Sequence, residues 1–357
     1  MNTIRISRVA GLAIGCGILL GWTAALQSKS PSQETGAARE VVSAGKAMAS
    51  HAKAFLESLT PDQRTSATCD FNSSQRMSWH YVPLEKRKGV ALQNLDKSQR
   101  RLAMTVLKAA TSDTGYEKSE TTMQLDAIIR HFEPSNTLRD PELYYFTVYG
   151  TPADVGRWGL SIEGHHLSLN YVIQDGRIAC ATPLFIGANP ARVIDNAGTH
   201  IKTGTHILRT EEELAAKLIQ SLTPEQRASA VIAEKSPMDM KEGHKPQTTA
   251  TDPQGISATK LSTDQKQTLT QFIETVFQNA PGEIAKPSFE RAKSEMDQIS
   301  IAWMGGTKAE EPHSCRVLGP SLLILFYKTQ NDASGNPVNH THVLWRTPGK
   351  DFGADLP

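Results

Sequence analysis

The stretch Ser58-Leu59-Thr60-Pro61-Asp62-Gln63-Arg64 occurs a second time in this chain of 357 residues, as Ser221-Leu222-Thr223-Pro224-Glu225-Gln226-Arg227. The offset is 163 residues (221 − 58). In both copies an apolar helical pattern precedes the stretch, and Thr before Pro is typical of a helix N-cap followed by the first helical residue. Each copy therefore predicts a helix, a break and the start of a second helix.

Three further blocks recur in the same order. Residues 89–99 align with 255–265, residues 145–151 with 300–306, and Glu163-Gly164 with Leu318-Gly319, at offsets of 166, 155 and 155. Because the order is kept and the offsets drift by only a few residues, the sequence predicts an internal duplication. The expected repeats are residues 46–183 and 209–347.

Each repeat is predicted to contain helices followed by strands, which gives an α+β fold with an antiparallel sheet. We expect a single domain at 46–357 in which the repeats pack about a pseudo-two-fold axis; two separable domains are the alternative. The polar residues 235–260 predict a long solvated loop. Expected helices are 46–58, 96–111, 116–133, 211–220, 263–279 and 288–297, and expected strands are 143–150, 158–173, 177–183, 298–305, 314–329 and 340–346.

The N-terminus has the features of an export signal. Arg5 and Arg8 precede an apolar run over residues 9–26, with small residues at 23–25. This pattern predicts a signal peptide or N-terminal anchor at 1–26, followed by a flexible stalk at 27–45. We therefore expect an exported protein, periplasmic, secreted or anchored at the cell envelope, which meets a membrane only through this segment.

Composition excludes several function classes. With 39% hydrophobic residues, 21% charged residues and a formal net charge of +1, the chain is of ordinary globular composition and has no bulk charge to attract nucleic acid. Gly-rich phosphate loops and the common nucleophile motifs are missing from the sequence. Cys69, Cys180 and Cys315 do not form a readable disulfide framework. A small-molecule ligand or substrate is the expected partner, and its site must be found from local clusters.

Four of the 11 histidines lie in predicted strands with apolar neighbours. Because residues two apart on a strand face the same side, His340 and His342 present their imidazoles together. His165 and His166 face opposite sides unless Gly164 marks a bulge, and Glu163 shares a face with His165. The predicted metal ligands are His165, His166, His340, His342 and Glu163.

This donor set suits zinc, iron or copper. If the two histidine clusters form one site, their ring nitrogens should approach within about 4–6 Å, with a carboxylate beside them. A metal-free polar pocket and purely structural histidines are the other interpretations.

Aromatic and polar residues near the histidines predict the lining of a pocket. Arg346 directly follows the His-x-His strand, where it could either form an ion pair with Asp351 or bind an anion. The sequence does not identify a catalytic residue. The predicted pocket residues are Trp79, His80, Tyr81, Asn170 and Arg346.

Several motifs occur in a fixed order along residues 47–356 and together resemble the exported family called domain of unknown function 3500. The resemblance implies membership and no activity. Family members carry Trp-Arg-Asp after His-x-His, whereas this chain has Trp345-Arg346-Thr347, which weakens any proposal that needs a carboxylate at 347. The motifs are Trp79-His80-Tyr81-Val82-Pro83, Arg139-Asp140-Pro141, Trp158-Gly159, Glu163-Gly164-His165-His166-Leu167-Ser168-Leu169-Asn170, Gly187-Ala188-Asn189-Pro190-Ala191, His340-x-His342 and Asp351-Phe352-Gly353.

The leading hypothesis from the sequence is an exported, metal-dependent enzyme, either a hydrolase or an oxidoreductase, that holds a small substrate beside the histidines. The rival hypothesis is a metal-free small-molecule binding module of the cell envelope.

Overall fold

All six predicted helices are present among the eight α-helices of the described residues. The structure is a computed structural model that describes residues 42–356. Thr60 and Thr223 cap α2 (Pro61–Ala67) and α6 (Pro224–Ala230) with the same capping box, in which the threonine side chain and a glutamine side chain each accept the other residue's backbone N–H. The remaining helices are α1 (Ala44–Ser58), α3 (Lys97–Ala109), α4 (Asp113–Phe132), α5 (Arg209–Ser221), α7 (Thr263–Phe277) and α8 (Gly282–Ser294).

The predicted export segment at 1–26 and most of the predicted stalk lie outside the described residues. Ala44 and Gly45, which were assigned to the stalk, belong to α1. Within residues 42–356, no helix is long and apolar enough to cross a membrane.

The recurring heptapeptide makes a recurring set of contacts. In each copy two glutamines bond to each other and to two backbone carbonyls. These hydrogen bonds join the turn between the first two helices (α1 and α2, or α5 and α6) to the N-terminal end of the next helix (α3 or α7). The carbonyl contacts are Gln63 Nε2 to Asn94 O and Gln99 Nε2 to Ser58 O in the first copy, and Gln226 Nε2 to Lys260 O and Gln265 Nε2 to Ser221 O in the second.

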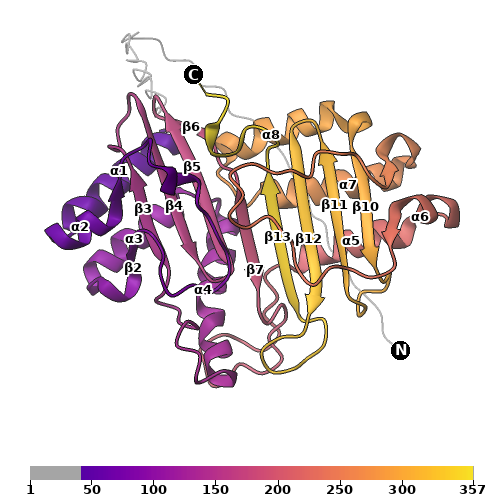
Figure 1. The fold of residues 1–357 in the computed structure, drawn as a ribbon, viewed down its shortest axis with the longest axis horizontal. Helices are drawn as coiled ribbons and strands as arrows, with labels where there is room; N and C mark the ends of the chain where they lie inside the picture. The colour runs from indigo at the N-terminus through magenta and orange to yellow at the C-terminus, as the bar shows by residue number, and fades with distance from the viewer. Residues whose placement is uncertain (1–41, 357) are drawn as a thin grey trace, which may run out of the picture. The chain divides into compact units, whose positions relative to one another are not determined.

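A thirteen-stranded sheet, largely antiparallel, runs through the described residues (Figure 1). Its main path is β1-β3-β4-β5-β7-β13-β12-β11-β10-β8, so the antiparallel pair β7–β13 stands at the centre of the path with four strands on each side. The longer strands are β3 (Tyr145–Tyr149), β4 (Arg157–Gly164), β5 (Leu167–Gln174), β7 (Leu184–Ala188), β10 (Ser300–Gly305), β11 (His313–Gly319), β12 (Leu322–Gln330) and β13 (His340–Arg346). The short strands are β1 (Thr68–Cys69), β2 (Val90–Ala91), β6 (Arg177–Cys180), β8 (Val231–Ala233) and β9 (Ile256–Ser257).

Two predicted strands, 158–173 and 314–329, are wrong because each is a hairpin. The two-residue turn His165-His166 joins β4 to β5, and Pro320-Ser321 joins β11 to β12. Neither turn has the Asn-Gly or Asp-Gly signal of a tight hairpin, and His166 takes the left-handed backbone (φ 63) that glycine or asparagine usually supplies. The predicted strand 177–183 is present as β6 but ends at Cys180, and the separate strand β7 that follows it was not predicted.

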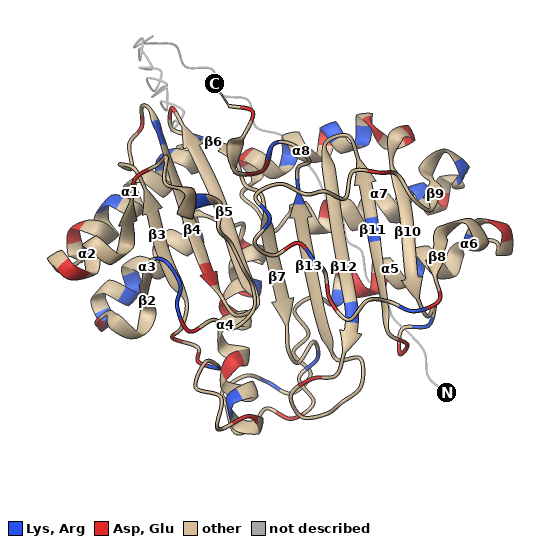
Figure 2. Cartoon of the chain, viewed as in Figure 1, with Lys and Arg blue, Asp and Glu red and all other residues tan. Residues whose placement is uncertain are grey.

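Helices cover one face of the sheet, and two long loops, residues 70–89 and 234–255, cross the other (Figure 1). Strand residues alternate between the two cores: Val343 and Trp345 pack on the helix side, whereas Leu344 packs with the loop aromatics. Most charged residues lie on helices and loops (Figure 2). The prediction of a solvated loop at 235–260 is wrong for Met240 and Glu242, which are buried against the sheet.

Candidate metal centre

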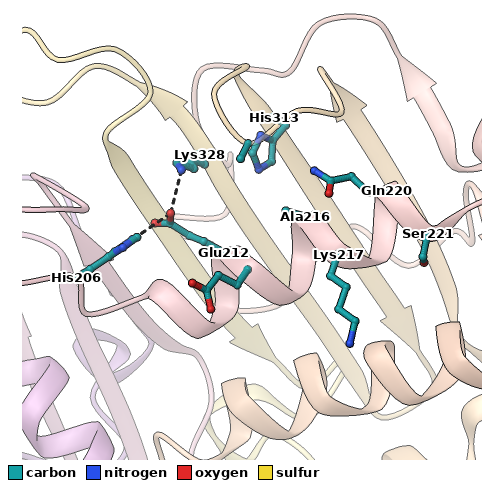
Figure 3. A pocket seen from close by; sticks show the side chains of 10 residues that line it. His206, Glu212, Ala216, Lys217, Gln220, Ser221, His313 and Lys328 are labelled. Atoms are coloured by element: carbon teal, nitrogen blue, oxygen red, sulfur yellow. Dashed lines mark ion pairs between the residues drawn. The ribbon is translucent and has the colours of Figure 1, made fainter.

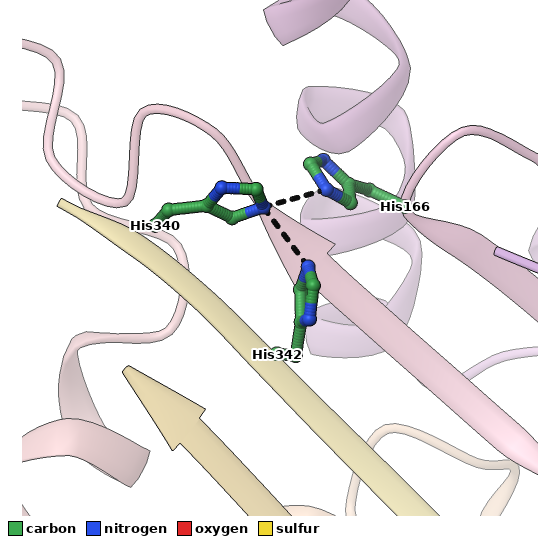
Figure 4. Close-up of side chains that lie close together, drawn as sticks. All are labelled: His166, His340 and His342. Carbon is green, nitrogen blue, oxygen red and sulfur yellow. Dashed lines mark hydrogen bonds between the residues drawn. The ribbon is translucent and has the colours of Figure 1, made fainter. Parts of the chain in front are cut away.

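Three histidines bring their ring nitrogens together at one end of the central strand pair (Figure 4). The Nε2 atom of His340 lies 2.8 Å from Nε2 of His166 and 2.9 Å from Nε2 of His342. The three possible ligand atoms lie within 4.8 Å of one another. The expected approach of the two histidine clusters is confirmed.

The local backbone explains how these side chains meet. His340 and His342 open β13 and point to the same side of the sheet, as the strand alternation predicts. His166 reaches them from the β4–β5 turn: its N–H donates to the Tyr81 carbonyl at 2.8 Å, and its own carbonyl accepts the Gly187 N–H at 2.7 Å. A non-glycine residue with positive φ that is fixed on both sides is a strained feature of the kind found at functional sites.

Gly187 on β7 makes room for the histidines. It pairs with His342 across the two central strands. A Cβ atom at position 187 would lie 2.9 Å from His342 Cδ2 and 3.0 Å from His166 Cδ2, too close for either ring to stay in place. A glycine inside a strand is the sequence signal for such a close approach.

Asp239 is the carboxylate that contacts the group. Its Oδ1 atom lies 2.8 Å from Nδ1 of His342, and the Tyr81 hydroxyl donates to its Oδ2 at 3.3 Å. Burial alone would raise the pKa of Asp239, but the hydrogen bonds that its carboxylate accepts, that from His342 first, lower the pKa on balance, so the carboxylate is ionised. Sequence reasoning missed Asp239, because it lies in a polar loop 103 residues before His342 and has no motif around it.

His165, predicted as a ligand, is held by other groups. Its Nδ1 atom is 2.5 Å from Asp126 Oδ1 on α4, and its Nε2 atom is 2.8 Å from Nη1 of Arg139. The Tyr144 hydroxyl also contacts Asp126 and the His165 carbonyl, at 2.9 and 2.6 Å. Although the ring lies against that of His166, with centroids 3.7 Å apart, both of its nitrogens are occupied. The hairpin turn places the adjacent histidines differently from the strand that was expected.

Glu163, predicted as the carboxylate of the site, is not part of the group either. It pairs with Lys88 at 2.9 Å and approaches Arg87 at 3.9 Å. The prediction carried strand alternation from His165 back to Glu163, but the strand ends at Gly164, so that alternation does not extend through the turn.

The predicted pocket residues separate into two environments. Trp79 and His80 line a cavity of about 370 Å³ together with Glu163 and His244. Tyr81 is buried instead, stacked on Phe185 with ring centroids 4.1 Å apart.

Asn170 and Arg346 are likewise buried, so neither lines that cavity. The Asn170 amide donates to Ser168 Oγ and to the Pro183 carbonyl. Arg346 forms the ion pair with Asp351 that the sequence allowed, Nε to Oδ2 at 2.7 Å, so the anion-site alternative is not what its contacts support.

Two of the three clustered histidines are poised as neutral ligands. Burial, reinforced by the neighbouring imidazoles, holds the pKa of His166 and of His340 well below the usual value. Both rings are therefore neutral at neutral pH, with a proton on one of their two nitrogens. A neutral imidazole offers a lone pair to a metal ion, so no proton has to be displaced first.

A second polar group lies on the helix side of the sheet, around a cavity of about 600 Å³ beside α5 (Figure 3). Glu212 lies 3.0 Å from His206 and 2.9 Å from Lys328, and it accepts a 2.6 Å hydrogen bond from Thr341. Burial raises the pKa of Glu212, but these partners lower it on balance. The strand alternation that brings His340 and His342 to one face brings Thr341 to the other.

The β4–β5 hairpin has apolar residues at the positions that lie equally far from its own turn. His313 and Lys328 pair across β11 and β12 at the same distance from the turn as Trp158 and Ile173 across β4 and β5. Trp158 and Ile173 are fully buried. His313 is the buried first residue of β11.

Comparison with known proteins gives a family but no activity. No curated protein and no solved structure matches the chain. A family model described as "Protein of unknown function (DUF3500)" matches residues 42–354, which include His166, His340, His342 and Asp239. This match covers nearly all of the described residues and agrees with the resemblance seen in the ordered motifs. The chain belongs to the DUF3500 family.

Proposed function

We propose that this protein is an exported metalloenzyme in which His166, His340 and His342 bind one divalent transition-metal ion, with zinc the first candidate. Three neutral imidazoles with an open fourth position are a common catalytic zinc arrangement. Such an ion would lower the pKa of a bound water to make a nucleophile for hydrolysis, or would react with dioxygen if it is iron or copper.

The observation that carries the proposal is the convergence of lone pairs on one point. Asp239 only accepts hydrogen bonds, so Nδ1 of His342 holds a proton and the neutral ring offers its lone pair at Nε2. Burial keeps His340 neutral, so one of its two ring nitrogens carries a lone pair. The Nε2 atoms of the two rings lie 2.9 Å apart, where one metal ion could accept a lone pair from each.

The distances also fit a metal after a small adjustment. Two nitrogens about 2.0–2.1 Å from a tetrahedral ion lie roughly 3.3 Å apart. The observed 2.8 and 2.9 Å therefore need to lengthen by a few tenths of an ångström. Asp239 supplies the carboxylate that metal-bound imidazoles commonly contact through their second nitrogen, which fixes the ring and its tautomer.

Metal analysis of untagged protein tests the proposal directly. After dialysis into metal-free buffer and titration with zinc, plasma mass spectrometry should find about one zinc ion per chain. A tag-free preparation matters because a histidine tag binds the same ions. Protein that takes up no stoichiometric zinc, iron or copper would contradict the proposal, and the metal-free binding module would then be the better description.

Export is the second part of the proposal, supported by the basic start and apolar run of residues 1–26. In a bacterial host, the full chain should be recovered from the cell envelope or medium, and a chain that lacks residues 1–26 should stay in the cytoplasm. Fractionation followed by immunoblotting measures this. Equal cytoplasmic recovery of both chains would refute export.

We infer, in addition, that the chain arose by duplication and that its repeats are related by a pseudo-two-fold axis between β7 and β13. The recurring helix order, the symmetric sheet order and the shared glutamine contacts support this inference. Superposition of residues 46–183 on 209–347 should place Ser58 on Ser221, and a different element order in the overlay would overturn the inference.

A further inference from the structure

A guanidinium group lies beside the three histidines. Nη1 of Arg139, on the loop that follows α4, is 2.8 Å from Nε2 of His165, whose ring lies against that of His166. Burial is the main cause that lowers the pKa of His166 and His340, and the positive charge of Arg139 adds to it in both cases. Arg139 is therefore close enough to act electrostatically on two of the three proposed ligands.

Hydrogen-bonding roles orient this guanidinium. Asp126 accepts the proton on Nδ1 of His165, so Nε2 of His165 must accept from Arg139. The Nε atom of Arg139 donates to Glu133 at 2.9 Å. Among the described residues, no hydrogen-bond partner is seen for Nη2. The Arg139 side chain is 14% exposed, so it is not completely closed off from solvent.

The charges at this position change when a metal ion binds. Without an ion, Arg139 pairs with Glu133 at 2.9 Å and faces the buried Asp126 across the ring of His165. A divalent ion on the triad would add two positive charges next to Arg139, and in a poorly solvated site these repel each other. An anion that coordinates the ion and meets the free edge of the guanidinium relieves that repulsion. Arg also matches carboxylate and phosphate oxygens in planar, two-point geometry.

We infer that Arg139 binds the anionic group of the substrate, a carboxylate or phosphoryl oxygen that lies between this guanidinium and the metal ion. The inference rests on the proposed metal site and names the class of substrate that the site accepts: small oxyanions rather than neutral molecules. Arg139 is then a substrate-binding residue, and His165 with Asp126 positions it.

Cobalt-substituted protein provides the test, because the visible spectrum of cobalt(II) changes when an anion becomes a ligand. Inorganic phosphate and acetate are titrated separately into the cobalt(II) form of the wild type, of Arg139→Met and of Arg139→Lys. The wild type should bind at least one of the two anions with a Kd of about 1 mM or below. Arg139→Met should raise that Kd by at least about tenfold, and Arg139→Lys, which keeps the charge without the fork, should fall between.

Arg130→Met is the matched control. Arg130 lies in the last turn of α4 and pairs with Asp140 at 2.7 Å, but its side chain is 50% exposed. Its anion affinity should equal that of the wild type. If Arg139→Met binds both anions as the wild type does, or if the wild type shows no spectral change with either, the inference is overturned. If Arg139→Met does not fold, an Arg139→Lys variant with unchanged anion affinity overturns it equally. Failure of the wild type to bind cobalt(II), seen before any anion is added, refutes the metal site itself.

Discussion

Replacing His342 with alanine is expected to abolish the stabilisation that zinc gives to this protein. At a free zinc concentration of 100 times the Kd, binding to the native state should raise the free energy of unfolding of the wild type by about 2.7 kcal/mol. His342→Ala removes one of the three proposed ligands, which is also the imidazole that Asp239 contacts. Its melting temperature should therefore be the same in zinc and in EDTA, as measured by calorimetry.

His244→Ala is the control for this experiment. His244 lies in the loop of residues 234–255, over the same face of the sheet as the triad. Its ring packs against His80 and is not part of the triad. It should keep the full zinc-dependent rise in melting temperature. A rise of wild-type size in His342→Ala would show that zinc acts elsewhere on the chain.

Gly187→Ala tests the same proposed metal site without the removal of a ligand. The added methyl group would press on the rings of His342 and His166, so the nitrogens could not adopt the spacing that one ion requires. We expect a loss of zinc affinity of at least about tenfold, or 1.4 kcal/mol. Unchanged zinc affinity would mean that the rings are not confined as the structure indicates.

The sequence predicted much of this fold, because its local signals agree with its tertiary structure. Thr-Pro capping boxes marked α2 and α6, and the alternation around His340 and His342 predicted both the strand and the shared direction of the two rings. Where local preference and tertiary packing agree, the sequence pattern and its periodicity are sufficient to predict a helix or strand.

The errors all come from residues whose conformation is set by distant contacts. His166 adopts positive φ because Tyr81 and Gly187 bond to its backbone, and neither residue is near it in the sequence. Once the hairpin was mistaken for one strand, His165 and Glu163 were given the wrong neighbours. Asp239 and Arg139 reach the site from loops, where side-chain direction has no periodicity to reveal it.

Arg346→Met is expected to destabilise the protein by about 3–5 kcal/mol, because it leaves the buried Asp351 without a cation and leaves the buried Glu242 with only Lys245. Arg346 and Asp351 are fully buried, and Nη1 of Arg346 lies 2.7 Å from Oε2 of the buried Glu242. Burial already raises the pKa of Asp351, and Arg346 is the main group that counteracts this rise. Urea unfolding of the variant and the wild type measures the loss.

The same arginine anchors the loop that carries Asp239. Nη2 of Arg346 donates to the carbonyls of Lys245 and Pro246 at 2.9 and 3.1 Å, so its removal should also expose residues 234–255 to proteases. Arg316→Met is the matched control: it contacts the same loop through the Asp252 carbonyl at 2.7 Å but buries no carboxylate there. It should cost about 1 kcal/mol or less. Equal losses in the two variants would mean that loop contacts, and not the buried charges, set the stability of this face, and zinc affinity should then fall in both through Asp239.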